Sequence, residues 1–256
     1  MIKAIFFDID GTLVSHTKNQ VSASTRNALA ILKEKGIRRI IATGRHLSEI
    51  DSLPMEGLDF DGYLMLNGQL CYDEHKRLVA GNPLVGEQKD ILLQIFEARD
   101  TPIMLIEQDK MYINFVNERV RLAQQSVSAW MPQVQPYTGG TIYQAVAFIT
   151  PEEKALLCSR LTGCRISQWM ELAVDIVPAH SGKAAAIAKY LDRNRMTKEQ
   201  IMAFGDGNND VDMLQFAGIG IAMGNAEDRI RAAADYVTDH IDENGIYNAL
   251  KHFQII

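Results

Sequence analysis

The stretch KAIFFDIDGT at residues 3–12 joins a short apolar run to two closely spaced aspartates. An apolar run of this length that ends in polar turn residues is typical of a buried strand in a parallel sheet. We therefore expect a strand at Lys3–Phe7, with Asp8 and Asp10 just beyond its carboxyl end. Ligands of open parallel sheets bind at this end of the strands. The opening of the chain thus indicates both an α/β fold and a ligand site.

The following segments repeat the alternation of apolar strands and amphipathic helices. Ser24–Lys35 places apolar side chains on one helical face and ends before a glycine, a common helix cap. Strands are expected at Ile37–Ala42 and Tyr63–Leu66, and a helix begins at Leu47. After Pro178 the alternation returns as helix, strand, helix and strand, expected at 183–191, 201–204, 210–216 and 220–223. This order predicts a Rossmann-like parallel sheet with covering helices.

Residues 82–178 follow a different pattern, because their apolar runs occur as hairpin pairs. Ile103–Ile106 pairs with Met111–Phe115, and Arg165–Trp169 pairs with Leu172–Val177. The other elements expected here are helices at 87–99, 117–129 and 151–161 and a strand at 144–149. Helices and hairpins in this order favour an antiparallel sheet covered on one face.

The two patterns predict two domains. An α/β core would consist of residues 1–81 and 179–256, and an α+β domain of residues 82–178 would be inserted into it. A chain of 256 residues is long enough to build both.

Composition and charge limit the classes of partner. The 26 basic and 32 acidic side chains give a net charge of -6, which disfavours a broad cationic surface for nucleic acid or anionic lipid. The opening MIKAIFF is too short for a secretory signal, and no uncharged stretch approaches the roughly 18 apolar residues of a membrane helix. We expect a cytoplasmic protein that binds neither nucleic acid nor membrane, with its three cysteines reduced.

Four polar clusters fall at the expected carboxyl edge of the parallel sheet: Asp8–Thr12, Thr43–Arg45, Lys183 and Gly205–Asp210. Taken singly, the first could be a turn, the second a helix cap and the third a solvated charge. Together, they would leave uncompensated charge at one edge unless a metal ion and an anion neutralised it. Carboxylate oxygens favour a hard cation, so we expect Mg²⁺ rather than zinc.

This combination suits phosphoryl transfer. A carboxylate attacks a phosphate dianion only when their repulsion is screened, which the cation and Lys183 would do. Asp8 and Asp10 lie one residue apart in an extended segment and point in similar directions, so one can attack while the other handles protons. The hydroxyl and backbone N–H groups of Thr43 and Gly44, just before a helix, would hold phosphate oxygens.

The sequences DIDGT at 8–12, ATGR at 42–45, Lys183 and GDGNND at 205–210 resemble, in order and spacing, the four motifs of the haloacid dehalogenase (HAD) superfamily phosphatases. The large insert between the second and third motifs resembles the Cof-type branch with a C2-type cap. The resemblance covers the whole chain. It implies a HAD core with an inserted cap, and hydrolysis of phosphoric monoesters of small metabolites such as sugar phosphates.

The resemblance also implies a role for each motif residue. Asp8 would be the nucleophile that forms an aspartyl-phosphate, and a Mg²⁺ ligand. Asp10 would protonate the leaving alcohol and then activate water, while its backbone carbonyl binds the metal. Asp206 would be the third protein ligand of the metal, and Asp210 would steady Lys183 or metal-bound water. The phosphoryl oxygens would be held by Thr43, the amides of Gly44 and Ile9, Lys183 and Asn209.

Two other functions stay open at this point. The protein could be a phosphomutase that returns the phosphoryl group to a sugar, or a sensor that binds sugar phosphates without reaction. A sensor needs no acid–base carboxylate beside a nucleophile, which favours an enzyme. The inserted domain would close over the site and select the leaving group. Arg45, Glu171 and His180 are compatible with substrate contact and equally with a solvated surface position.

Overall fold

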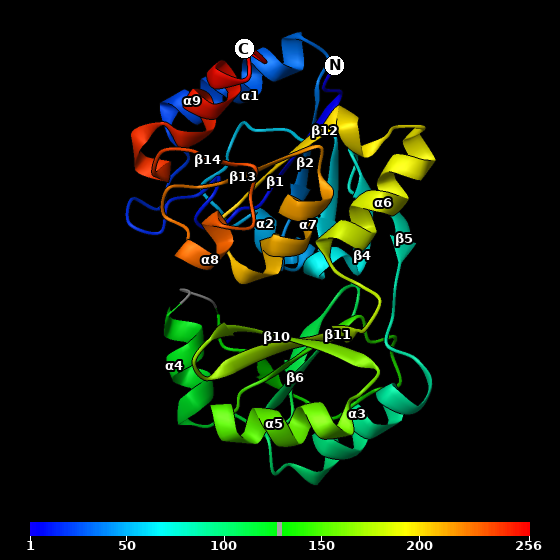
Figure 1. Ribbon diagram of the computed structural model, residues 1–256. Helices are drawn as coiled ribbons and strands as arrows, with labels where there is room; N and C mark the ends of the chain where they lie inside the picture. Colours follow the sequence, from blue (N-terminus) through cyan, green and yellow to red (C-terminus); the bar gives the residue numbers. More distant parts are fainter. Residues whose placement is uncertain (127–129) are drawn as a thin grey trace. The chain divides into compact units, whose positions relative to one another are not determined.

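The computed structural model describes residues 1–126 and 130–256, which form two compact units. Unit 1 contains Met1–Ala80 and Gly182–Ile256, and unit 2 contains Gly81–Ser181 (Figure 1). The chain therefore leaves unit 1 once, builds unit 2 without interruption, and returns to complete unit 1.

One sheet forms the centre of unit 1. Its strands are β1 (Ala4–Phe7), β2 (Arg38–Ala42), β3 (Gly62–Met65), β4 (Leu70–Asp73), β5 (Leu78–Gly81), β12 (Ile201–Gly205), β13 (Ile219–Ala222) and β14 (Tyr236–Val237). They lie in the order β14-β13-β12-β1-β2-β3-β4-β5. Neighbours from β14 to β3 run parallel, whereas β4 pairs with β3 antiparallel. The predicted Rossmann-like parallel core is thus confirmed.

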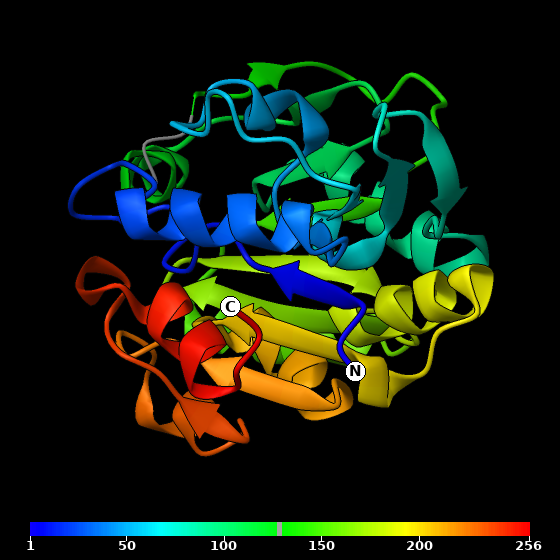
Figure 2. The same cartoon turned by 90° about the horizontal axis from the view of Figure 1, so that it is seen from above.

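Helices cover both faces of this sheet. They are α1 (Ala23–Glu34), α2 (Leu47–Ile50), α6 (Lys183–Asn194), α7 (Val211–Phe216), α8 (Asp228–Arg231) and α9 (Gly245–His252). α1 and α9 lie side by side on one face, and α6 and α7 pack together on the other (Figures 1 and 2). Short 3-10 turns complete the unit: η1 (Leu66–Gly68), η2 (Lys198–Gln200), η3 (Asn208–Asp210) and η4 (Ile241–Glu243).

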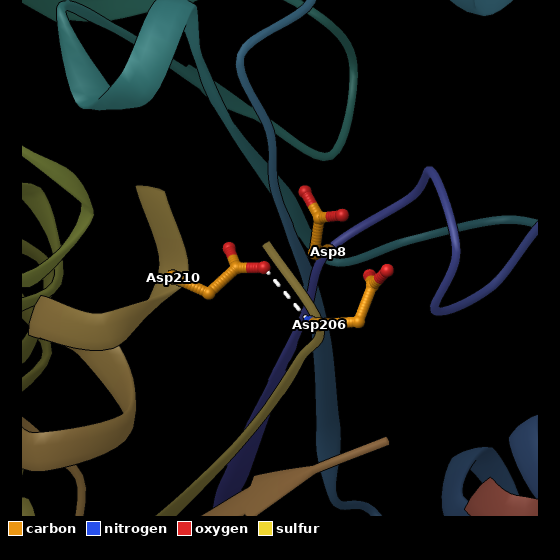
Figure 3. Close-up of side chains that lie close together, drawn as sticks. All are labelled: Asp8, Asp206 and Asp210. Atoms are coloured by element: carbon orange, nitrogen blue, oxygen red, sulfur yellow. Dashed lines mark hydrogen bonds between the residues drawn. The ribbon is translucent and has the colours of Figure 1, made fainter. Parts of the chain in front are cut away.

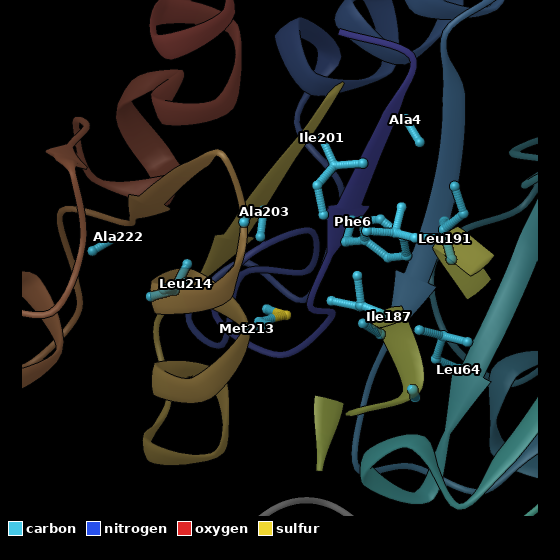
Figure 4. Packing of buried hydrophobic residues seen from close by; sticks show 14 of the residues in the cluster. Ala4, Phe6, Leu64, Ile187, Leu191, Ile201, Ala203, Met213, Leu214 and Ala222 are labelled. Atoms are coloured by element: carbon cyan, nitrogen blue, oxygen red, sulfur yellow. The ribbon is translucent and has the colours of Figure 1, made fainter. Parts of the chain in front are cut away.

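Side-chain alternation along β1 allows this strand to join two helical layers. Ala4 and Phe6 belong to the apolar cluster that includes Ile187 of α6 and Met213 of α7 (Figure 4). The residues that alternate with them point to the opposite face of the sheet. All four β1 residues are completely buried, as expected for a strand covered on both sides. The strand that carries Asp8 is therefore anchored from both faces.

Sequence patterning missed β4, β5, β14 and α9. The sequence of β4 is LCYD and β14 has two residues, so neither contains the apolar run that marks a strand. Their positions come from hydrogen bonds to β3 and β13. α9 is a short helix whose partner in the fold is α1, far away in the sequence. These elements depend on neighbours more than on their own residues.

The sheet of unit 2 is mainly antiparallel. Its strands are β6 (Ile103–Ile106), β7 (Met111–Ile113), β8 (Gln133–Val134), β9 (Gln144–Ala147), β10 (Cys164–Met170) and β11 (Ala173–Pro178), in the order β10-β11-β9-β6-β7-β8. Both predicted hairpins are present, and β8 joins β7 in parallel. α3 (Gly86–Ala98) and α5 (Pro151–Arg160) cover one face (Figure 1). An apolar cluster including Phe96 and Leu157 joins these helices to the strands.

Two predicted elements of unit 2 end differently from expectation. The helix expected at 117–129 is observed as α4 (Glu118–Ser126), and positions 127–129 lie outside the described residues. The second strand of the first hairpin ends at Ile113 rather than at Phe115.

Among the described residues, no helix combines the length and apolar character needed to cross a membrane. The expected cytoplasmic location stays a prediction.

The buried side chain of Asn114 explains why β7 ends early. Its Oδ1 accepts hydrogen bonds from the backbone N–H groups of Ile103 and Phe115, at 2.8 and 2.9 Å. Its Nδ2 donates to the carbonyls of Phe96 and Thr101, at 2.9 Å each. One side chain thus satisfies backbone groups at the end of α3, in the following turn and at the edge of the hairpin.

We expect Asn114→Ala to lower the free energy of unfolding of unit 2 by about 2 kcal/mol or more, because buried backbone groups lose their partners. Both tryptophans, Trp130 and Trp169, lie in unit 2, so the fluorescence change during urea unfolding reports this unit. The exposed control Gln133→Ala should change stability by no more than about 0.5 kcal/mol. Equal unfolding midpoints for the two variants would contradict the assigned role of Asn114.

Candidate active site

The parallel pairing of β1 with β12 brings distant aspartates together. Asp8 directly follows β1 and Asp206 directly follows β12, and these strands are paired with Phe7 beside Phe204. Asp210 lies in η3, a short distance along the chain. Each of the three aspartates offers a carboxylate oxygen, and these oxygens all lie within 4.8 Å of one another (Figure 3). The predicted carboxylate cluster therefore forms at the carboxyl edge of the sheet.

Lys183, the first residue of α6, lies between two of these carboxylates. Its Nζ donates to Asp8 Oδ1 at 2.6 Å and to Asp210 Oδ1 at 2.5 Å. The lysine is completely buried. Burial alone would lower the pKa of Lys183, but the charges of Asp210 and Asp8 raise it above its ordinary value, so the ammonium group stays charged. The structure thus places a permanent positive charge beside Asp8.

Asp210 also organises the loop that carries Asp206. Its Oδ2 accepts a hydrogen bond from the backbone N–H of Asp206 at 3.0 Å (Figure 3). The same oxygen accepts the backbone N–H of Gly207 at 2.8 Å. Since Oδ1 already binds Lys183, both oxygens of this fully buried carboxylate have donors. Asp210 therefore acts as an anchor for its loop and for Lys183.

Burial and neighbouring negative charge both raise the pKa values of Asp8 and Asp206. Burial and the neighbouring Asp210 raise the pKa of Asp8 well above its ordinary value, despite the opposite effect of Lys183. Burial, followed by Asp210, raises the pKa of Asp206 to about 7. A neighbouring cation would favour the charged form of both carboxylates.

Asp10 is held by Arg45, whose location the sequence left open. Nε and Nη2 of Arg45 donate to Asp10 Oδ2 and Oδ1, each at 2.7 Å. Glu49 lies 3.6 Å from Nη1 on the opposite side of the guanidinium group. Arg45 is therefore part of the site rather than a solvated surface residue. Glu171 and His180, the other open candidates, are exposed residues of unit 2.

The residues fit the predicted cation. Four carboxylates, those of Asp8, Asp10, Asp206 and Asp210, share two cationic side chains, one of which also faces Glu49, so the site has an excess of acidic groups that a divalent cation would offset. All four offer oxygen, the ligand atom that Mg²⁺ prefers. Burial, followed by Asp210, raises the pKa values of Asp8 and Asp206, so a cation beside these two carboxylates would favour their charged forms.

The candidate phosphate-binding residues form a second group at the same edge. Thr43 is buried after β2, and its Oγ1 accepts the N–H of Arg45 at 3.2 Å. Asn209 donates from Nδ2 to Oδ1 of Asn67 at 3.0 Å. A Cβ atom added to Gly44 would lie 3.3 Å from Asn67 Oδ1 and 3.7 Å from Asn209 Nδ2, so these residues lie close together.

Ile9 lies between Asp8 and Asp10 and shapes the turn that follows β1. Its carbonyl accepts the backbone N–H groups of Thr12, Leu13 and Val14 at 3.2, 2.9 and 2.8 Å. These bonds close the turn that carries the DIDGT sequence, and its side chain is fully buried. The backbone around Asp8 is thus fixed locally as well as by the sheet.

Sequence reasoning gave no role to three polar residues of the site, although it placed Thr12 in the first polar cluster. Thr12 and Asn225 donate hydrogen bonds to the two oxygens of Asp206, and Asn67 accepts one from Asn209. Each follows an expected strand, so position alone could have marked them. Asn225 in particular comes two residues after the expected strand at 220–223, at the same edge as the aspartates.

The family model for haloacid dehalogenase-like hydrolases matches residues 5–250, and the chain belongs to this family. The Bacillus subtilis (strain 168) protein YkrA is 32% identical over 257 residues, which cover 99% of this chain and 98% of the relative. The 5-amino-6-(5-phospho-D-ribitylamino)uracil phosphatase YcsE of the same organism is 28% identical over 253 residues, which cover 98% and 96%.

A solved structure gives the same assignment. The HAD subclass IIB sugar phosphatase BT4131 superposes with a TM-score of 0.89 at 32% identity, with 99% of this chain and 100% of that chain covered. The family membership predicted from the four motifs is thus confirmed, and the protein is a phosphatase of this family.

The raised pKa of Asp206 predicts how metal-free stability depends on pH. The folded carboxyl has a pKa of about 7, whereas an unfolded aspartate has about 3.9, so the folded protein binds more protons between these values. The free energy of unfolding should therefore fall as the pH rises from about 5 to about 8 in EDTA. Mg²⁺ should restore stability at the higher pH. Thermal unfolding with and without Mg²⁺ measures both effects.

Two aspartate variants separate this effect from general surface charge. Asp206→Asn should flatten the fall in melting temperature and reduce the stabilisation by Mg²⁺, because one of the uncompensated carboxylates is removed. Asp59→Asn, an exposed substitution outside the site, should keep both effects. A metal-free melting temperature that rises over this pH range would contradict the assignment.

Proposed function

We propose that the protein is a Mg²⁺-dependent phosphatase that hydrolyses small phosphorylated metabolites, sugar phosphates among them, through an aspartyl-phosphate on Asp8. The observation that carries the proposal is the buried ammonium group of Lys183, 2.6 Å from Asp8 and 2.5 Å from Asp210. This arrangement places the Asp8 carboxyl group beside a fixed positive charge, which favours its ionised form and screens its approach to a phosphate dianion.

The first step transfers the phosphoryl group to Asp8. Lys183 binds Oδ1, and we assign the attack on phosphorus to Oδ2. As the bond from Oδ2 to phosphorus forms, the bond from phosphorus to the substrate oxygen breaks. The leaving oxygen takes a proton from Asp10 and departs as a neutral alcohol.

The second step releases phosphate. Asp10, now ionised, accepts a proton from a water molecule as the water oxygen attacks the phosphorus. The bond between phosphorus and Asp8 breaks, which regenerates the Asp8 carboxylate and gives inorganic phosphate. The two hydrogen bonds of 2.7 Å from Arg45 favour this ionised form of Asp10, so Arg45 would have to release one oxygen before Asp10 carries the proton of the first step.

Mg²⁺, held by Asp8, Asp206 and the backbone carbonyl of Asp10, would screen the negative charge of the phosphoryl group. The phosphoryl oxygens would be oriented by the hydroxyl of Thr43, the amides of Gly44 and Ile9, Asn209 and Lys183. The close group of Gly44, Asn67 and Asn209 supports this assignment, because its polar atoms gather at one point of the sheet edge.

The relatives support a small organic phosphate as substrate. One is named as a sugar phosphatase and another as a phosphatase of a phosphorylated ribitylamino uracil. We propose that unit 2 is the substrate-specificity domain, since it interrupts a unit that already contains all the proposed catalytic residues. Its residues would then select the leaving group.

A panel of phosphate esters tests the substrate class. We expect Mg²⁺-dependent release of inorganic phosphate from sugar phosphates, and no release above background from Asp8→Asn, which lacks the nucleophile. Lys183→Ala should lower kcat/KM by about a hundredfold or more, because one stabilising charge is lost. Isomerised sugar phosphate without free phosphate would indicate a mutase, and binding without turnover would indicate a sensor.

The covalent step can be tested with p-nitrophenyl phosphate, whose leaving group departs without a proton. Acid-quenched Asp10→Asn protein should accumulate protein-bound phosphate, because attack by Asp8 proceeds while activation of water does not. Asp8→Asn is the matched control and should carry none. Mass spectrometry of the quenched protein locates the label. Protein-bound phosphate in Asp8→Asn, or on another residue, would reject the assigned nucleophile.

A further inference from the structure

Asn225 connects three separate segments around the candidate site. It lies in the loop after β13, and its Nδ2 donates to the carbonyl of Gly11 at 2.8 Å and to Oδ2 of Asp206 at 3.2 Å. Its Oδ1 accepts the backbone N–H of Ile241, the first residue of η4, at 3.1 Å. One side-chain amide thus joins the loops that follow β1 and β12 to the C-terminal part of unit 1.

Thr12 completes the contacts of the Asp206 carboxylate. Its hydroxyl donates to Oδ1 at 2.9 Å, whereas Asn225 donates to Oδ2. Thr12 is completely buried. Gly11 allows this arrangement: its φ is +80°, and a Cβ atom there would lie only 2.1 Å from Asp206 Oδ2. The backbone after β1 therefore packs directly against the carboxylate.

We propose that Asn225, together with Thr12, is a positioning residue that orients the Asp206 carboxylate for Mg²⁺. Two donors that bind different oxygens fix the plane of the carboxylate, which a single donor does not do. Each carboxylate oxygen has a second lone pair, so the hydrogen bonds leave room for a metal contact. This inference rests on the proposed metal site, but it concerns binding of the cation and needs no turnover.

The position of Asn225 also explains how a residue outside the four motifs reaches the site. The backbone N–H of the neighbouring Gly224 donates to the carbonyl of Asp239 at 3.1 Å, so a hydrogen bond joins this loop to the segment before η4. Backbone contacts therefore fix the loop that carries Asn225, and the Nδ2 group of Asn225 donates to Gly11 and Asp206. Partners of metal ligands typically contribute about 10- to 100-fold to metal affinity.

Calorimetric titration of the metal-free full chain with MgCl₂ tests the proposal. Asn225→Ala should weaken Mg²⁺ affinity by about tenfold or more. Thr12→Val, which removes the other donor and does not touch Ile241, should weaken it in the same direction. At saturating Mg²⁺ the kcat of Asn225→Ala should recover toward the wild-type value. Melting temperatures in EDTA show separately whether either variant is folded.

Asn248→Ala is the matched control, because its Nδ2 also donates to a carboxylate, Asp239 Oδ2 at 2.7 Å, outside the candidate site. It should bind Mg²⁺ as the wild type does. Wild-type affinity in folded Asn225→Ala or Thr12→Val would overturn the positioning role. A wild type that binds no Mg²⁺ would overturn this role and the proposed metal site together. Weaker binding in both variants, with no phosphate ester hydrolysed by the wild type, would support the role and reject the proposed reaction.

Discussion

A completely buried ammonium group must be paired with negative charge, and this requirement organises unit 1 around Lys183. The lysine follows directly after the chain returns from unit 2 at Gly182. Its contacts with Asp8 and Asp210 join the start of α6 to the end of β1 and to η3. The two separate stretches of unit 1 are therefore connected through a single charged side chain as well as through the sheet.

The rigid centre of the sheet makes such a concentration of charge tolerable. β1 and β12 are completely buried strands, and the stacked rings of Phe7 and Phe204 lie one residue before Asp8 and two residues before Asp206, with centroids 5.3 Å apart. Side chains on rigid, packed strands hold their geometry better than side chains on mobile loops. Burial and repulsion from Asp210 raise the pKa values of Asp8 and Asp206, and packing on both faces of the sheet opposes that repulsion.

The sequence predicts what depends on local pattern and misses what depends on distant partners. The central strands and both hairpins follow from apolar runs such as AIFF, and the motif residues follow from their place after those runs. β4 and β14 depend on pairing with neighbours, so their own residues do not reveal them. Likewise, Thr12 is 194 residues from Asp206 along the chain, and the bond between them exists only in the folded protein. The pairing of Arg45 with Asp10 is hidden for the same reason.

The hydrogen bonds divide the four carboxylates into two kinds. Asp210 accepts hydrogen bonds from Lys183 and from two backbone N–H groups. Asp10 accepts two hydrogen bonds from the guanidinium group of Arg45. Protein donors therefore compensate most of the charge of both carboxylates. The carboxylate of Asp206 accepts hydrogen bonds from the neutral side chains of Thr12 and Asn225. Asp8 accepts one from Lys183, which also donates to Asp210. The binding free energy of a divalent cation is most favourable beside the carboxylates whose charge is least compensated by protein donors. This supports the proposal that Asp8 and Asp206 are the side-chain metal ligands and that Asp210, although close enough, serves as an anchor.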